Sequence, residues 1–292
     1  MHSFTLITTA IVSSVLYSSF IYANDIPTID NNTQQEVLNR PASADPKLKD
    51  LKNIKIDDLK VNAKADQPDS IKDPLQPLNR KVFAFNDYLD RNVARPLAVQ
   101  YVTKVPQPAR NGYRAFKENL VEPRNAVYQL IQARPLRATQ TLGRFAINTV
   151  TTLGFVDIAQ HFGLTLEDED FGQTLGYYGI PSGPYIVLPV FGPNTFRSTF
   201  GIGVDSQGRL QKYILKEHSL YWSEQFLRGL DTRAQILDYD SVLTGDKYAQ
   251  IRDIYLQRTE FTIAEKRGLE SENLFIEDNF DEFDNNDDIS DE

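Results

Sequence analysis

The chain has 292 residues, of which 41% are hydrophobic and 24% are charged, as in folded, water-compatible proteins. It contains no cysteine, which excludes disulfides, thiolate metal sites and cysteine nucleophiles. The formal net charge is −9, but Glu277 to Glu292 alone hold nine acidic residues and no basic one, so the rest of the chain is neutral. A neutral body argues against a nucleic-acid-binding protein, which needs a positive excess.

The N-terminal segment predicts export from the cytoplasm. Phe4 to Tyr22 is apolar with interspersed serine and threonine, so residues 1–23 are predicted to be a signal peptide that is cleaved after Ala23. An uncleaved membrane anchor is the alternative, since about 19 apolar residues just span a bilayer. Residues 24–72 are rich in Asp, Asn, Lys and Pro with few aromatics, which predicts a disordered tether.

The folded body is predicted over residues 73–265. Its first helix is expected to begin near Asp73 and to end before Pro96, because apolar residues recur at three- and four-residue steps: Leu78, Val82, Phe85, Leu89 and Val93. Prolines divide residues 105–144 into short helical patterns, which predicts a compact, curved arrangement. Amphipathic helices are predicted over residues 215–237 and 248–261, and residues 266–292 are predicted to be a disordered acidic tail.

Two stretches carry no charge. The first is Phe145 to Val156, between Arg144 and Asp157, where Gly154 is expected to act as a hinge because glycine tolerates unusual backbone angles. The second is Phe171 to Phe196, in which glycine and proline recur too often for a transmembrane helix. Irregular backbone at membrane depth survives only where protein covers it or where it lines a water-filled path. A soluble enzyme can use the same segment as a buried substrate loop, and composition alone favours this interpretation slightly.

No catalytic or metal-binding motif is recognisable. The histidines are His2, His161 and His218, and none has the spacing of a zinc site. Gly179 to Gly183 places its serine one position too late for a nucleophile elbow, and Gly201 to Gly203 lacks the third glycine of a dinucleotide fingerprint. The sequence therefore predicts no catalytic residue, no metal site and no cofactor.

Several long motifs together resemble the MlaA/VacJ family of outer-membrane lipid-transport proteins. The resemblance covers roughly residues 73–262, and its main motifs are DPLQPLNRKVFAFN at 73–86, VPQPARNGYRAFKENLVEP at 105–123, GRFAINTVTTLGFVDIA at 143–159 and FGQTLGYYGIPSGPYIVLPVFGPNTFR at 171–197. It implies a mainly α fold, in which short amphipathic helices and irregular Gly/Pro-rich segments form a compact ring around a central channel. The ring would lie in the inner leaflet of the outer membrane, on the periplasmic side.

The resemblance also implies a function without enzymatic activity. Phospholipids misplaced in the outer leaflet would pass through the channel to a soluble periplasmic lipid carrier, often beside a trimeric porin, so that lipid asymmetry is maintained. Family members are commonly lipoproteins that are tethered through an acylated cysteine. This sequence has no cysteine, so attachment is expected to depend on embedded apolar surface, helped by porin contact or by an uncleaved N-terminus.

Two sets of residues are predicted to serve this transport. A headgroup that crosses the hydrocarbon layer needs polar partners, and arginine suits phosphate because its planar fork makes two parallel bonds. The candidates for the lipid path flank or interrupt the uncharged stretches: Arg80, Asn86, Arg144, Asn148, Tyr177, Tyr178 and Arg197. Each can equally be a structural cap or a core hydrogen-bond partner. The residues expected to face the membrane are Phe83, Phe155, Ile186, Val187, Leu188 and Phe191.

Two other classes of function remain open at this point. The chain can be a secreted soluble hydrolase or lipase that buries the Gly/Pro-rich stretch around its substrate. It can also be a porin-bound scaffold without a channel of its own. Recovery of the mature protein as a freely soluble periplasmic monomer would favour the hydrolase.

Overall fold

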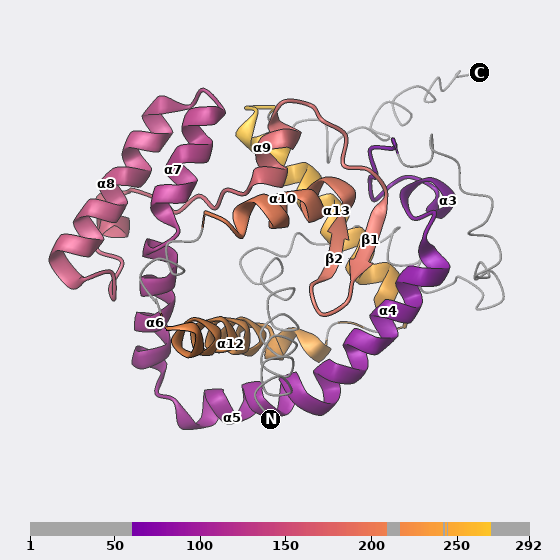
Figure 1. Ribbon diagram of the computed structural model, residues 1–292, viewed down its shortest axis with the longest axis horizontal. Coiled ribbons are helices and arrows are strands. Elements are labelled where there is room, and N and C mark those ends of the chain that lie inside the picture. The colour runs from indigo at the N-terminus through magenta and orange to yellow at the C-terminus, as the bar shows by residue number, and fades with distance from the viewer. Residues whose placement is uncertain (1–59, 209–216, 242, 244, 270–292) are drawn as a thin grey trace, which may run out of the picture.

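The computed structural model describes residues 60–208, 217–241, 243 and 245–269. The predicted signal peptide, most of the predicted tether and nearly all of the predicted acidic tail lie outside these residues. The described part is mainly helical, which confirms the predicted fold class (Figure 1).

The helices and strands follow in a simple order along the chain. The first half contains α3 (Asp69–Lys72), α4 (Gln76–Leu89), a π-helical turn (Asp90–Ala94), α5 (Arg95–Lys104), α6 (Gln107–Asn119), α7 (Glu122–Ile131), α8 (Pro135–Thr152) and a 3-10 turn (Ala159–Phe162). The second half contains α9 (Phe171–Tyr177), β1 (Tyr185–Leu188), β2 (Gly192–Thr195), α10 (Phe196–Asp205), α12 (His218–Gln235), a 3-10 turn (Leu237–Ser241) and α13 (Lys247–Lys266).

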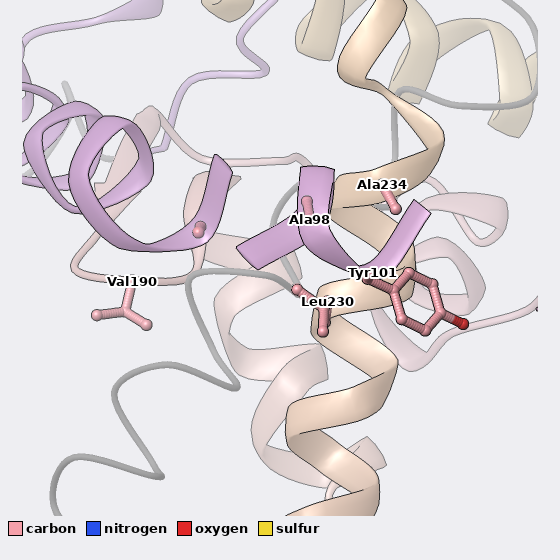
Figure 2. Packing of buried hydrophobic residues seen from close by; sticks show 6 residues of the cluster. Ala98, Tyr101, Val190, Leu230 and Ala234 are labelled. Carbon is pink, nitrogen blue, oxygen red and sulfur yellow. The ribbon is translucent and has the colours of Figure 1, made fainter. Parts of the chain in front are cut away.

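The elements follow one another around the edge of the molecule. In Figure 1, α4, α5 and α6 run along the lower right, the bottom and the left, and the hairpin of α7 and α8 lies at the upper left. In the same view α9 and α10 lie at the top beside α7, and the β1–β2 hairpin and α13 lie toward the right, where β1 contacts α4. Helix α12 packs across α5. Figure 2 shows Leu230 and Ala234 of α12 against Ala98 and Tyr101 of α5, with Val190 from the tip of the β-hairpin in the same hydrophobic cluster. The central channel remains a prediction.

The predicted end of the first helix before Pro96 is wrong. Helix α4 ends at Leu89, and the π-helical turn leads directly into α5, where Pro96 lies in the first turn. Proline is tolerated there because the first N–H groups of a helix have no intrahelical partner. Pro96 therefore lies at the start of a new helix and does not end helical structure, which continues to Lys104.

The β-hairpin within the second uncharged stretch is held by two asparagine side chains of α4. The amide of Asn79 donates to the carbonyl of Tyr185 at 3.1 Å and accepts from the N–H of Val187 at 2.9 Å. The amide of Asn86, two helical turns later, donates to the carbonyl of Leu188 at 3.0 Å and accepts from the N–H of Val190 at 2.7 Å. These side chains take the place of a third strand, since the free edge of a two-stranded sheet would otherwise leave its backbone groups unpaired.

The folded body begins before Asp73, where the sequence analysis placed its start. Asn62 forms a parallel bridge with Gly183, and the N–H of Ala63 donates to the hydroxyl of Ser182 at 2.9 Å. Lys72 is buried and pairs with Asp253 of α13 at 2.9 Å. The polar composition of this segment suggested disorder, but its polar groups are bonded to the body.

Replacing Asn79 by alanine tests the role of the asparagine pairing. Asn79 is fully buried, so the substitution leaves a buried carbonyl and a buried N–H of β1 without partners. We expect N79A to lower the free energy of unfolding by about 2–4 kcal/mol, measured by urea denaturation. The control is Asn111→Ala at an exposed position of α6, for which we expect a change within about 0.5 kcal/mol. Equal effects of both substitutions would contradict the proposed pairing role.

Candidate functional site

The hairpin of α7 and α8 carries its large apolar side chains on the outside. On α7, Val127, Leu130 and Ile131 follow at three- and four-residue spacing, and each is about half exposed. On α8, Leu136 is 74% exposed and Val150 is 83% exposed. Water-soluble helices turn such residues toward the protein core, because burial of one such side chain stabilises by about 1.5–3 kcal/mol. Both helices of this hairpin do the opposite.

The seam between α7 and α8 is polar. Thr141 donates to the side-chain carbonyl of Gln129 at 2.7 Å, and the Arg144 guanidinium pairs with Glu122 at 2.7 Å. All four side chains are at least 97% buried. Polar groups hold this pair of helices together, since a buried polar group is tolerated only where it is hydrogen-bonded.

The same inversion extends over the described part of the chain. Among its residues, more polar and charged side chains than hydrophobic ones are buried. Further exposed large hydrophobic residues lie on α8, in the loop after it, on α4 and α5 and around α9 and α10: Leu142, Leu153, Phe155, Val156, Phe162, Leu78, Phe85, Tyr88, Leu97, Val99, Tyr178, Ile180, Phe196 and Phe200. Large apolar side chains gathered on an exposed face, as on the α7–α8 hairpin, are typical of contact with a membrane or another protein. No helix among the described residues has both the length and the apolar character needed to span a bilayer.

Two of the predicted lipid-path residues meet at the end of α8. The amide of Asn148 and the guanidinium of Arg144 both donate to the Asp157 carboxylate, at 3.0 and 2.9 Å. Asn148 also accepts from the N–H of Ala159 at 2.9 Å, and Arg144 donates to the carbonyl of Leu164. Both side chains are buried and bonded to protein, so they tie the loop after α8 to the helix.

Gly154, the predicted hinge, sits in a tightly packed turn. Its φ is +85°, a value that side-chain-bearing residues rarely adopt. An added Cβ would lie 2.8 Å from the amide nitrogen of Asn119, which itself donates to Thr149 at 2.9 Å. Glycine is thus required at this position for the shape of the turn, and the hinge motion stays a prediction.

The remaining lipid-path candidates lie in separate environments. Arg80 makes a two-bonded ion pair with Asp246, at 3.2 and 2.7 Å, and Asn86 belongs to the pairing with β1 described above. Tyr177 and Tyr178 contact each other edge to face at the end of α9, and the hydroxyl of Tyr178 donates to the carbonyl of Ile131 on α7. The structure therefore joins Arg144 with Asn148 and Tyr177 with Tyr178, but it does not gather all seven residues at one place.

Arg197 at the start of α10 differs from Arg80 and Arg144. It is 8% exposed and donates one N–H to the carbonyl of Ile180 at 2.6 Å, while its Nε has no hydrogen-bond partner. Burial lowers the pKa of the guanidinium, only partly offset by Tyr255 and Asp170. Gly176 leaves room for the group, because an added Cβ would lie 3.0 Å from the guanidinium carbon. A buried, incompletely bonded cation is the kind of group that receives an anion.

The structure corrects two of the residues predicted to face the membrane. Val187 is 2% exposed, because side chains alternate along β1 and Val187 shares the inner face with Tyr185. Phe83 packs on this inner cluster and contacts the ring of Tyr248 at 5.5 Å between centroids. Ile186, Leu188 and Phe191 are half-buried, and Phe155 is 49% exposed while it stacks on Phe116 at 4.8 Å.

The sequence of this chain matches a known protein family. A sequence model of the MlaA lipoprotein family matches residues 71–262, which is more than half of the chain. The chain belongs to the MlaA family. The resemblance that the sequence motifs indicated is thereby confirmed.

Relatives with assigned names support the same family. The chain is 38% identical over 197 residues to the intermembrane phospholipid transport system lipoprotein MlaA of Shigella flexneri and to that of Escherichia coli K12, covering 65% of this chain and 77% of each relative. The Haemophilus influenzae protein of the same name is 32% identical over 218 residues, or 73% of this chain and 87% of the relative. A solved structure from work on maintenance of bacterial outer membrane lipid asymmetry matches with a TM-score of 0.59 and 36% identity, covering 65% of this chain and 98% of that one.

The exposed apolar surface on α7 and α8 was not predicted from the sequence. Membrane contact was expected in the uncharged stretches, whereas Val127, Leu130 and Leu136 lie in segments that also contain arginine and glutamate. Their helical spacing was visible, but periodicity shows only that a stripe exists. A signal was present in the polar residues that recur at three- and four-residue steps on the facing sides of the two helices: Glu122, Asn125 and Gln129 on α7, and Thr141, Arg144 and Asn148 on α8.

Glu122 provides a pH-dependent test of the polar seam. Burial raises the pKa of its carboxyl from 4.5 to about 7, although the hydrogen bond and the positive charge of Arg144 lower it. Between these two values the folded state holds a proton that the unfolded state has released, so the free energy of unfolding falls as pH rises through this window. The contribution is about 3 kcal/mol at most. We expect Glu122→Gln to show a smaller loss of stability from pH 5 to pH 7 than the wild type, measured by urea denaturation.

Glu265→Gln serves as the control for this titration, because it removes an exposed carboxyl and leaves all buried carboxyls, including Glu122, unchanged. Asp73 and Glu169, whose pKa values burial raises to about 6, titrate in both variants and in the wild type. A pH dependence of E122Q identical to that of wild type would contradict the assignment.

Proposed function

We propose that this protein is an outer-membrane component of a phospholipid transport system, and that it lies in the periplasm-facing leaflet. It receives phospholipids misplaced in the outer leaflet and passes them to a soluble periplasmic lipid carrier, so that the membrane keeps its asymmetry. Family membership supports this proposal, since relatives are named as parts of an intermembrane phospholipid transport system. Those names describe transport components, which agrees with a role without catalysis.

The observation that carries the proposal is the inverted hairpin of α7 and α8. Its outer face is apolar, and its seam is made of bonded polar groups such as Arg144 with Glu122. In water this face would be costly, whereas a hydrocarbon layer solvates it and leaves the polar seam intact. Neither helix combines the length and the apolar character needed to span the bilayer, so the hairpin is proposed to lie within one leaflet.

The lipid path in this proposal passes polar groups of the interior. Arg197 is the best supported of the predicted residues, because its guanidinium is buried and incompletely bonded. Arg80 and Arg144 are engaged by carboxylates and are assigned a structural role. A ring-like body with a central channel, and contact with a trimeric porin, belong to the same proposal.

Attachment to the membrane is proposed to rest on the exposed apolar surface. The relatives are named lipoproteins, so their names give no support to the expectation that the protein is held without lipidation. A secreted hydrolase, the alternative drawn from the sequence, gains no specific support. Within the described ranges no three histidine, cysteine, aspartate or glutamate side chains are grouped to hold a metal ion.

Cells that lack this protein provide the test of the function. We expect their outer leaflet to accumulate phosphatidylethanolamine that reacts with a membrane-impermeant amine reagent, and we expect expression of the protein to remove it. Arg197→Gln is expected to restore asymmetry only partly at normal protein abundance, because the buried cation for the headgroup is lost. The exposed Arg91→Gln is the control. Equal labelling with and without the protein would refute the proposed function.

Membrane binding through the hairpin is tested with two charged substitutions on its outer face. We expect the double variant Leu136→Glu and Val150→Glu to bind vesicles of phosphatidylethanolamine and phosphatidylglycerol at least about tenfold more weakly in a flotation assay. The reason is that each apolar side chain contributes about 1.5–3 kcal/mol on burial. A matched control, Gln107→Glu with Asn111→Glu, adds the same charge at exposed positions of α6. Equal weakening in both variants would show charge repulsion rather than loss of apolar contact.

A further inference from the structure

Helix α6 presents a row of hydrogen-bond donors to α12. Arg110, Tyr113, Arg114 and Lys117 follow at positions i, i+3, i+4 and i+7, so they share one face of the helix. Figure 1 shows the end of α12 lying against α6, and side-chain bonds join the two helices at this crossing. Arg228 of α12 completes the group, which we call the cationic wall.

One carboxylate of α12 is already neutralised by the wall. Asp231 is fully buried, and it accepts from the Arg114 Nε at 3.0 and 3.1 Å and from the Lys117 Nζ at 3.3 Å. The hydroxyl of Tyr101 and the amide of Gln235 donate to the same carboxylate. Asp231 therefore has no capacity left to balance further cations.

The second carboxylate is satisfied mainly by one arginine. Glu224 accepts from the Arg228 Nε at 3.2 Å and from the amide of Gln225 at 2.6 Å. The hydroxyl of Tyr113 lies 3.5 Å from both the carbonyl and the carboxylate of Glu224, which is long for an O–H bond. Glu118 also acts on Lys117, but burial raises the pKa of that carboxyl and so favours its neutral form. Burial likewise lowers the pKa of Lys117, so the charge count depends on the arginines. Arg110, Arg114 and Arg228 outnumber the carboxylates of Asp231 and Glu224, and the wall retains a positive excess.

Several donors of the wall lack a full partner. The Arg110 Nε and one terminal nitrogen of Arg228, Nη2, are buried and have no hydrogen-bond partner. The Arg228 side chain is only 12% exposed, so water satisfies it poorly. Arg110 makes no ion pair with a described carboxylate. Its positive charge is near enough to Tyr101 to oppose the burial that raises the pKa of that hydroxyl. Buried N–H groups without partners are rare in folded proteins and call for an acceptor.

We propose that the cationic wall binds a phosphate group. Guanidinium forks match the geometry of phosphate oxygens, and the hydroxyl of Tyr113 adds a neutral donor beside Arg110 and Arg228. The occupant is the phosphodiester of a phospholipid headgroup, an assignment that rests on the proposed transport function. Inorganic phosphate shares the same chemistry and is the other source of such a group. The wall is distinct from Arg197, which lies at the start of α10.

Calorimetric titration of the full chain in detergent tests the wall with three probes: dihexanoylphosphatidylethanolamine, inorganic phosphate and dihexanoylglycerol, which has the same acyl chains but no phosphate. We expect the double variant Arg110→Gln and Arg228→Gln to bind the phospholipid about tenfold more weakly or worse, because two charge-assisted bonds are lost. Binding of dihexanoylglycerol is expected to stay unchanged. The control is Arg91→Gln, whose side chain is 68% exposed, and it is expected to bind all three probes as the wild type does.

Tyr113→Phe keeps every charge and removes only the hydroxyl, so it serves if the double variant does not fold. We expect it to weaken phospholipid binding several-fold with no effect on dihexanoylglycerol. Binding of inorganic phosphate that depends on the same arginines would support the phosphate site and identify the free anion as an occupant. Unchanged phospholipid binding in a folded double variant, or an equal loss for dihexanoylglycerol, would overturn the inference.

The two proposals fail in different ways. If the arginines are needed for phospholipid binding while the outer leaflet is unaffected by the protein, the transport function is wrong and the site stands. If the protein restores asymmetry while the double variant binds phospholipid normally, the site is wrong and the transport function stands.

Discussion

The structure depends on a polar interior whose groups must bond to one another. Arg144 with Glu122 and Arg252 with Asp73 are buried ion pairs, and Arg233 is a buried arginine that pairs with the partly exposed Asp90. The last two join segments more than 140 residues apart. Such pairs stabilise little by themselves, because desolvation offsets most of their attraction, but removing one partner leaves a costly buried charge. The interior thus specifies one arrangement of short helices that hydrophobic packing alone would hold weakly.

The apolar exterior is the counterpart of this interior. The chain has 41% hydrophobic residues, and those buried in its described part are mostly alanine and tyrosine, such as Ala98 and Tyr185, so many leucine, valine and phenylalanine side chains lie outside. In water that surface would drive association, whereas in a membrane leaflet it is solvated. The α7–α8 hairpin has this same distribution, with polar groups in its seam and apolar groups on its outer face. The proposed lipid transport depends on that distribution.

The polar groups of the interior are of two kinds. Some are hydrogen-bonded within the fold, and others keep donors without a hydrogen-bond partner. Asn79, Asn86 and Asn148 each bond to backbone of a neighbouring segment, and they hold irregular chain in place where a sheet or helix would otherwise do so. Arg197 and the cationic wall retain donors that the protein does not satisfy. Transport of a charged headgroup needs both kinds, since a rigid frame keeps the unsatisfied donors from closing on each other.

The sequence by itself determined the family and the mainly helical fold, because motifs and helical periodicity act locally. The expectation of irregular backbone over residues 171–196 was wrong for much of that stretch, which contains α9, β1 and β2. The left-handed backbone of Gly154 is one that glycine tolerates, whereas its role as a hinge stays a prediction. Only the tertiary structure decided which face of each helix points inward. Val187 was expected outside and lies inside, and Phe83 was expected to face the membrane and packs, partly buried, on the inner cluster, while Leu136 and Val150 lie outside. Likewise the sequence does not distinguish Arg80, Arg144 and Arg197. Only long-range contacts show that the first two pair with carboxylates, whereas Arg197 donates to the carbonyl of Ile180. The reason is physical: periodicity fixes the angle between side chains on one helix, but the partner that each face meets comes from distant parts of the chain.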